Sequence, residues 1–82
     1  MTELLSGTVE VRETPDDRLA AVREGRAWHR VAEVTSVWRV ETDWWRTPIS
    51  RDYLRCLLET GECIEVYRDR RDGTWHSVRR YD

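Results

Sequence analysis

The sequence contains no Lys, Asn, Gln or Phe, although it carries fourteen Arg in 82 residues. Codon bias in a GC-rich genome explains such a composition, and the missing amides also fit a heat-adapted host. Because every strongly basic side chain is a guanidinium, bidentate pairs with carboxylates are favoured over loosely solvated charges. The net charge is −2, whereas a dedicated nucleic-acid binder usually has a strongly basic domain. The charge balance therefore counts against nucleic-acid binding.

Cysteine and long apolar runs are also scarce. Cys56 and Cys63 are the only cysteines, which is too few for a disulfide framework. Structural zinc sites use short paired spacings, which these two residues lack, so no metal is predicted. The longest apolar run is far too short to span a membrane, and residues 1–6 lack the basic region and apolar core of a signal peptide. We expect a soluble, cytoplasmic protein that makes no membrane contact.

Recognisable catalytic motifs are missing as well. Ser50 and Ser77 have no glycine-elbow context. Cys63 and His76 could meet across neighbouring strands, but no third group is available to orient the pair. The sequence therefore predicts a protein that is not an enzyme and needs no cofactor.

What the sequence does contain is a pattern typical of strands joined by short turns. Nineteen residues are β-branched, and Gly and Pro interrupt them at short intervals. Strands are predicted over residues 8–13, 18–23, 27–41, 51–59, 62–68 and 74–81. Residues 16–23 also fit a short helix, with an acidic start after Pro15 and a stop at Gly25. The whole chain, 1–82, reads as one β domain, and the order of residues 1–7 is left open.

The third predicted strand is too long to run straight. Its apolar positions change from odd to even numbers between Val31 and Val34. Such a phase change inside a strand is produced by a β-bulge or a bend. We therefore expect this strand to bend and to serve two parts of a curled sheet.

The hairpin over residues 53–67 allows a prediction of register. A three-residue turn with Gly61 in the left-handed conformation would set Arg55 opposite Glu65 and Tyr53 opposite Tyr67. The same register places five apolar residues on one face: Leu54, Cys56, Leu58, Ile64 and Val66. A favourable charge pair and a clean apolar face agree with each other. Cys56 then points inward and Cys63 outward, which excludes a disulfide between them.

These elements predict an all-β fold in a single small domain. We expect a strongly bent antiparallel sheet of five or six strands that forms a half-open barrel.

The segment from Arg39 to Pro48 is the strongest candidate for an interaction site. Adjacent residues of a strand point to opposite sides, so Trp44 and Trp45 cannot both lie in the core. Trp and Arg are enriched in protein hot spots and in base-stacking platforms. A structural role, in which both rings wrap the open end of a small barrel, is the alternative. The predicted interaction residues are Trp44, Trp45, Arg46, Arg39, Tyr53 and Tyr67.

A set of short motifs over residues 26–82 resembles a known bacterial module. The motifs are Trp38-Arg39-Val40-Glu41, Trp44-Trp45-Arg46, Arg51-Asp52-Tyr53, Tyr67-Arg68-Asp69, Gly73-Thr74-Trp75 and Arg80-Tyr81-Asp82. Together they look like the C-terminal region of ImuB-type proteins, which are catalytically inactive homologues of Y-family DNA polymerases, and like short stand-alone bacterial domains of unknown function.

The resemblance implies an adaptor role in DNA-damage tolerance, with a polymerase or a related repair factor as the protein partner. The polymerase body has no counterpart here, and the Gln-led clamp-binding peptide of that family is absent because the chain contains no Gln. Two other functions stay open. The first is a single-stranded nucleic-acid-binding small β-barrel. The second is self-association through an unpaired edge strand such as residues 8–13.

Overall fold

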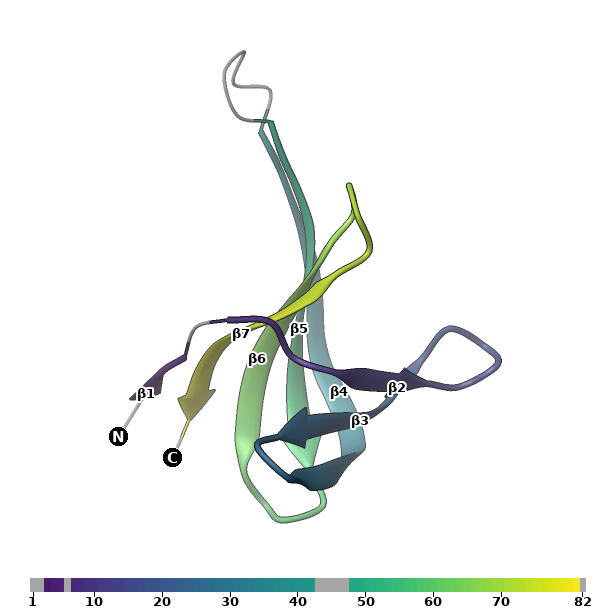
Figure 1. The fold of residues 1–82 in the computed structure, drawn as a ribbon, viewed down its shortest axis with the longest axis vertical. Helices are drawn as coiled ribbons and strands as arrows, with labels where there is room; N and C mark the ends of the chain where they lie inside the picture. Colours follow the sequence, from purple (N-terminus) through teal and green to yellow (C-terminus); the bar gives the residue numbers. More distant parts are fainter. Residues whose placement is uncertain (1–2, 6, 43–47, 82) are drawn as a thin grey trace.

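The computed structural model of the protein describes residues 3–5, 7–42 and 48–81. Its strands are β1 (Glu3–Leu4), β2 (Val11–Glu13), β3 (Leu19–Glu24), β4 (Ala27–Thr42), β5 (Ile49–Leu58), β6 (Cys63–Asp69) and β7 (Trp75–Tyr81). They form one antiparallel sheet in the order β1-β7-β6-β5-β4-β3-β2, drawn in Figure 1. No helix that could cross a membrane occurs in the described parts of the chain. The all-β prediction is confirmed.

The number of strands differs from the prediction, since the sheet has seven rather than five or six. The predicted strand over residues 8–13 is shortened to β2, and β1 forms a separate strand before it. The reason is that this segment changes partner. Val9 N donates to Trp75 O of β7, whereas Glu10 O accepts from Arg23 N of β3. Residues 8 and 9 are therefore bonded to β7, whereas β2 is an edge strand of the sheet that pairs only with β3.

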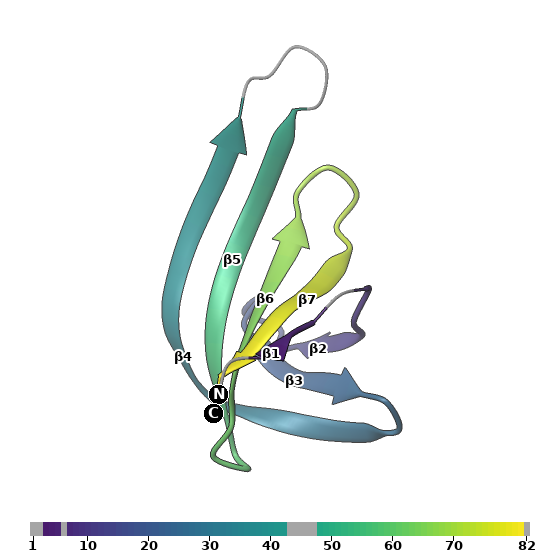
Figure 2. The ribbon, with the colours of Figure 1, turned by 90° about the vertical axis from the view of Figure 1, so that its left-hand side faces the viewer.

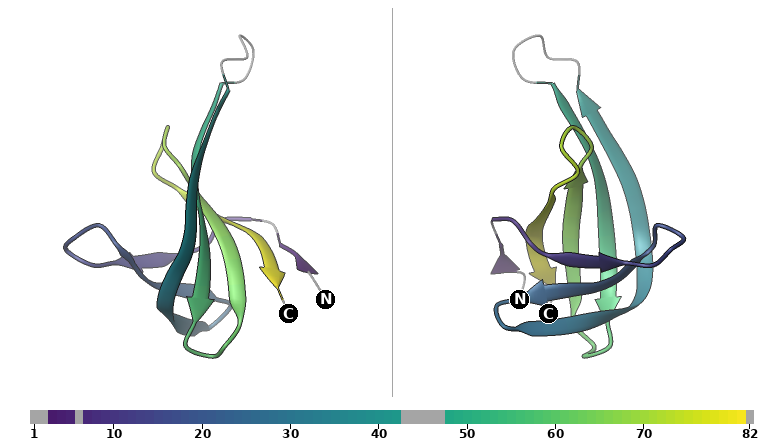
Figure 3. Two further views of the ribbon diagram at one scale, coloured as in Figure 1. Left: turned by 180° about the vertical axis from the view of Figure 1, so that it is seen from behind. Right: turned by 45° about the vertical axis from the view of Figure 1, so that its right-hand side comes forward.

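The sheet is not closed, because its end strands β1 and β2 pair with β7 and β3 and not with each other. These two strands are nevertheless consecutive in the chain, so the N-terminal segment runs from one edge of the sheet to the other. Figure 3 shows the purple segment crossing from the side of β7 to the side of β3.

The long strand β4 bends as predicted. Its first four residues pair with β3, and from Val31 onward it pairs with β5. The register shifts between Val31 and Glu33 and again between Val34 and Ser36. Bulges of this kind increase local twist and turn a strand, which carries β3 and β2 over one face of the sheet (Figure 2).

The β5–β6 hairpin has the predicted register, with Arg55 opposite Glu65 and Tyr53 opposite Tyr67. Gly61 adopts a φ of 92°, a conformation that glycine takes without steric cost. Cys56 is buried, Cys63 is half-buried, and both thiols are free, as predicted. The alternative left open for residues 16–23 is decided in favour of a strand, β3.

The core lies between β3 and the facing side of β5 and β6. Six buried side chains form its centre: Leu19, Val22, Cys56, Leu58, Ile64 and Val66. Val9, Val11 and Trp75 pack against this cluster from the N-terminal segment and β7. Residues 36–42 of β4 and 49–55 of β5, here called the arm, continue the hairpin beyond this core, toward the top of Figure 1. Of the residues that the sequence predicted for interaction, the arm carries Arg39 and Tyr53.

Candidate interaction surface

Four rings form a row across the face of β4–β7 that points away from the core, here called the outer face. Trp38, Tyr53, Tyr67 and His76 are register partners from four successive strands. Ring centroids are 5.4 Å apart between Trp38 and Tyr53, 5.2 Å between Tyr53 and Tyr67, and 4.7 Å between Tyr67 and His76. The first and last of these pairs are stacked, with interplanar angles of 9° and 17°.

Two arginines flank the ring row on the same face. The guanidinium of Arg51 lies 4.4 Å from the centroid of Tyr67, and Arg51 Nη1 donates to Tyr53 Oη at 3.3 Å. Arg55 lies 4.9 Å from Tyr81, to whose hydroxyl it also donates, and 5.7 Å from Trp38. The hydrogen bond from Arg51 to Tyr53 raises the pKa of Arg51. These cations therefore stay charged and are held against the rings.

A buried carboxylate balances the positive charge beside the row. Glu65 is 4% exposed and accepts a hydrogen bond from Tyr81 Oη at 2.8 Å. Its oxygens lie 3.3 Å from Arg79 Nε and 3.7 Å from Arg55 Nη2. The Arg55–Glu65 pair was predicted from the register; the roles of Tyr81 and Arg79 were not.

The stacked geometry limits what the row can bind. When rings stack on one another, their faces are covered by that contact and mainly their edges are exposed to solvent. Tyr53 lies between Trp38 and Tyr67, so a nucleobase cannot stack on it without displacing a neighbour. Trp38 differs, because it ends the row at the border of the sheet and stacks on one side only.

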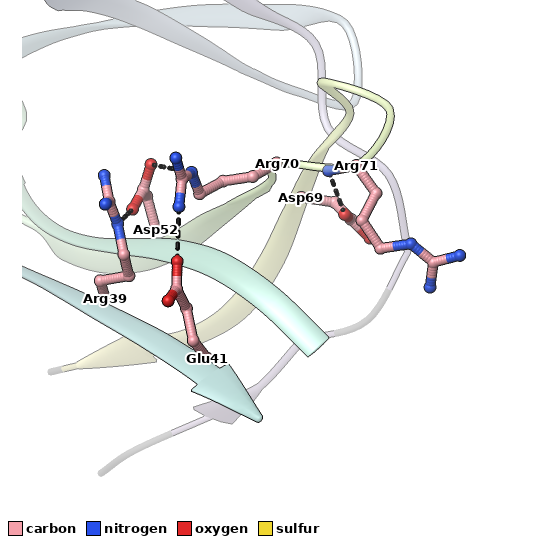
Figure 4. A network of polar contacts seen from close by, with 6 residues as sticks. All are labelled: Arg39, Glu41, Asp52, Asp69, Arg70 and Arg71. Atoms are coloured by element: carbon pink, nitrogen blue, oxygen red, sulfur yellow. Dashed lines mark hydrogen bonds and ion pairs between the residues drawn. The ribbon is translucent and has the colours of Figure 1, made fainter. Parts of the chain in front are cut away.

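A network of charged side chains occupies the opposite face of the arm (Figure 4). Arg39 Nε donates to Asp52 Oδ1 at 2.8 Å, and Arg70 Nη1 donates to Glu41 Oε1 at 2.6 Å. Arg70 Nε also lies 3.8 Å from Asp52 Oδ2. The hydrogen bond from Arg39 to Asp52 raises the pKa of Arg39. The network ties the β6–β7 turn to both strands of the arm.

A cleft of about 700 Å³ lies on the same face as this network, between the β2–β3 turn and the bend of β4. Its apolar lining consists of Leu19, Val31, Ala32, Val34, Val37, Leu54 and Trp75. Asp17 and Arg18 stand on one side, with Arg39 and Asp52 on the other. Val37 is 66% exposed, so an apolar side chain on β4 faces this cleft without cover.

The border of the sheet along residues 36–42 of β4 has no strand partner among the described residues, since pairing with β3 ends at Arg30. In β5, Leu58 N donates to Glu62 O and Ser50 O accepts from Arg70 N, so even-numbered residues bond toward β6. Odd-numbered residues of β5 therefore bond toward even-numbered residues of β4. It follows that Val37, Arg39 and Glu41 direct their backbone N–H and C=O groups outward.

The predicted interaction residues are divided by this geometry. Tyr53 and Tyr67 lie together in the ring row, whereas Arg39 lies on the opposite face with Asp52. Trp44, Trp45 and Arg46 fall outside the described residues, so their role stays a prediction. Sequence reasoning missed the places of Trp38 and His76 in the row. The pairing of β4 with β5 and of β6 with β7 would have revealed them.

The described residues include no group of three or more His, Cys, Asp or Glu side chains placed to hold a metal ion. Comparisons of the chain with protein-family models, with curated proteins and with solved structures found no match.

Proposed function

We propose that the protein is a non-enzymatic interaction module that binds a partner protein through the free edge of β4. The observation that carries this proposal is the outward-facing row of backbone groups on Val37, Arg39 and Glu41, beside an apolar cleft. An open sheet edge binds an extended segment by adding it as a further strand. The backbone supplies affinity, and the flanking side chains select the sequence.

Alternate side chains of such a segment would contact the two faces of the sheet beside the β4 edge. On one face Val37 and the cleft offer apolar contact, with Asp17 and Arg18 nearby. On the other face Trp38 presents an unstacked side to the added strand. The resemblance to ImuB-type modules supports a partner from DNA-damage tolerance, such as a polymerase or a repair factor, with the protein as an adaptor in the cytoplasm.

Single-stranded nucleic acid is a weaker candidate for the same surface. The faces of Tyr53 are covered by its neighbours in the ring row. Arg55 is paired with Glu65, and Arg39 lies on the other side of the sheet, so these cations do not share one groove. Base-stacking platforms require exposed ring faces, which within the ring row leaves only the two end rings, Trp38 and His76.

The test is an affinity pull-down of the tagged protein from host lysate, with and without nuclease, using wild type and two variants. Val37→Pro removes an outward N–H without removing a bond to β5, and proline is tolerated at such edge positions. Val37→Ile keeps both the donor and the apolar side chain and is the matched control. A nuclease-resistant partner lost with proline but kept with isoleucine is the expected result.

Two outcomes would contradict the proposal. Capture that proline does not affect would mean that partners bind elsewhere on the molecule. Capture that disappears with nuclease would favour the nucleic-acid function. Circular dichroism of both variants checks that the fold is retained.

A further inference from the structure

The free edge of β4 is complementary to itself when it runs antiparallel to a second copy. We propose that two copies of the protein pair through residues 36–40 of β4, about a two-fold axis that passes by Trp38. The inference rests on the proposed function in using the same edge, and it names a second copy of this chain as one of the strands that the edge accepts.

Charge and the bulge each argue against one possible centre of the pairing. In an antiparallel pair, residues that stand opposite each other have side chains on the same face of the sheet. The two copies therefore keep their outer faces on the same side only if the two-fold axis passes at a residue position and not between two residues. An axis at Arg39 sets Arg39 opposite its own copy, and like charges opposite each other are destabilising. An axis at Val37 sets Thr35 opposite Arg39, which draws the bulge between Val34 and Ser36 into the ladder.

An axis at Trp38 avoids both conflicts. It pairs Ser36 with Val40 of the second copy and Val37 with Arg39, so no like charges stand opposite each other. The pairing lies wholly inside the stretch of β4 whose register against β5 is regular. The bulge marks the end of the pairing, as bulges commonly do at sheet edges.

The ring row gives this register a second, independent support. Even-numbered residues of β4 bond toward β5, so Trp38 would stand opposite its own copy at a non-hydrogen-bonded site. Side chains approach most closely at such sites, with Cα atoms about 4.5 Å apart. Each Trp38 would stack its uncovered side on the other, and two rows of four rings would become one row across both copies.

The contact is small, so we expect a weak dimer that forms only at high concentration. Five residues from each copy bury less than the roughly 1,000 Å² that a stable specific interface requires. We therefore expect an equilibrium in which the mass measured by sedimentation rises from monomer toward dimer as concentration increases. Val37→Pro should hold the protein at the monomer mass, while Val37→Ile, which keeps the N–H donor and the apolar side chain, should still dimerise.

Disulfide crosslinking tests the register directly. In a Cys63→Ser background, with buried Cys56 kept, Ser36→Cys and Val40→Cys are made as separate proteins. The two positions face each other across the proposed axis, within the Cα separation of about 4.4–6.8 Å that a disulfide requires. Mixed and oxidised, the two proteins should give a crosslinked heterodimer, whereas each variant alone should give far less.

Equal crosslinking in the mixture and in the separate proteins would overturn the register. A monomer mass at every concentration, together with no crosslink, would overturn self-pairing altogether. In that case a proline-sensitive partner in the pull-down would still support the proposed function. The experiments therefore distinguish a failure of self-pairing from a failure of the proposed function.

Discussion

At the scale of single residues, Glu65 is the least typical side chain of the domain. It is the only buried charged residue among those described, and it sits on the outer face rather than in the core. Tyr81, Arg79 and Arg55 cover it and balance its charge. A carboxylate held in this way fixes the spacing of three strands, because its partners come from both β5 and β7.

Replacing Glu65 with Gln should lower the free energy of unfolding by about 1–2 kcal/mol, because two arginines lose their counter-charge while shape is kept. Solvent reaches both arginines, which keeps the loss below that of a fully buried pair. Urea denaturation measures the change. Glu10→Gln is the control, since the exposed Glu10–Arg23 pair should contribute less than about 0.5 kcal/mol. Equal effects at the two sites would show that burial of Glu65 is unimportant.

The two thiols should differ in reactivity. Burial raises the pKa of Cys56 to about 11, so at pH 8 only about one thiol in a thousand is the reactive thiolate. Cys63 is partly exposed and should react with a chromogenic disulfide reagent in the native protein. We expect one reactive thiol per chain in buffer and two in urea. A native Cys63→Ser variant that still reacts rapidly would contradict the burial of Cys56.

The raised pKa of Cys56 also has a consequence for stability. The unfolded chain releases the thiol proton near pH 9, whereas the folded chain keeps it until about pH 11. Between these values the folded state binds more protons than the unfolded state, so stability falls as pH rises through this window. Cys56→Ala should show a shallower fall over the same range in thermal unfolding.

At the scale of elements, the arm is held by ion pairs, whereas the core is held by apolar packing. It projects beyond the buried cluster and is tied down by the Arg39–Asp52 and Arg70–Glu41 pairs. Exposed ion pairs contribute little to global stability. They can still decide how often a hairpin opens locally, because local opening has a smaller free energy than global unfolding.

Asp52→Asn should therefore speed amide hydrogen exchange in peptides that cover residues 36–42 and 49–53, while β6 and β3 keep their protection. The same change in the β2–β3 turn, Asp16→Asn, is the control for charge alone. Added salt should shrink the difference between wild type and Asp52→Asn, since exposed charges are screened. Unchanged exchange in the arm would mean that backbone bonds alone hold it.

The elements also show how far the sequence could be interpreted. The β5–β6 register was predictable because Gly61, the Arg55–Glu65 pair and the apolar face all demand it. The bend in β4 was predictable from the phase change at Val31. The pairing of residues 8–13 was not predictable, because alternating Val residues indicate a strand but do not indicate which strand it pairs with. Trp38 was likewise missed in the ring row, because nothing in the sequence sets the register of β4 against β5 across the connection from Thr42 to Ile49.

At the scale of the whole molecule, the N-terminal segment holds the two borders of the sheet together. Thr8 bridges to His76, Leu5 N donates to Val78 O, and Glu10 O accepts from Arg23 N. Val9 packs against the core from this segment, whereas Thr8 is exposed. The segment thus adds an apolar side chain to the core as well as hydrogen bonds to both borders.

Val9→Asp should lower the free energy of unfolding by about 2 kcal/mol or more, because a charge enters the apolar cluster. Thr8→Asp changes the same segment on its solvent side and should stay within about 0.5 kcal/mol of wild type. Chemical denaturation of both variants gives the comparison. Similar losses at the two positions would indicate that the segment acts through its backbone alone.

The pairing of β1 with β7 has a mechanical consequence. Glu3 lies opposite Arg80 in an antiparallel ladder, so a pulling force applied at these two residues peels the strands apart one bonded pair at a time. Strands pulled in shear share the load among many hydrogen bonds. Strands pulled apart in this direction do not, because only the outermost pair of bonds carries the load. Tethered at residues 3 and 80 in an optical trap, the domain should open first at this border, at a force set by a single pair of bonds. Fused in series with other domains at these positions, it would be the first to yield.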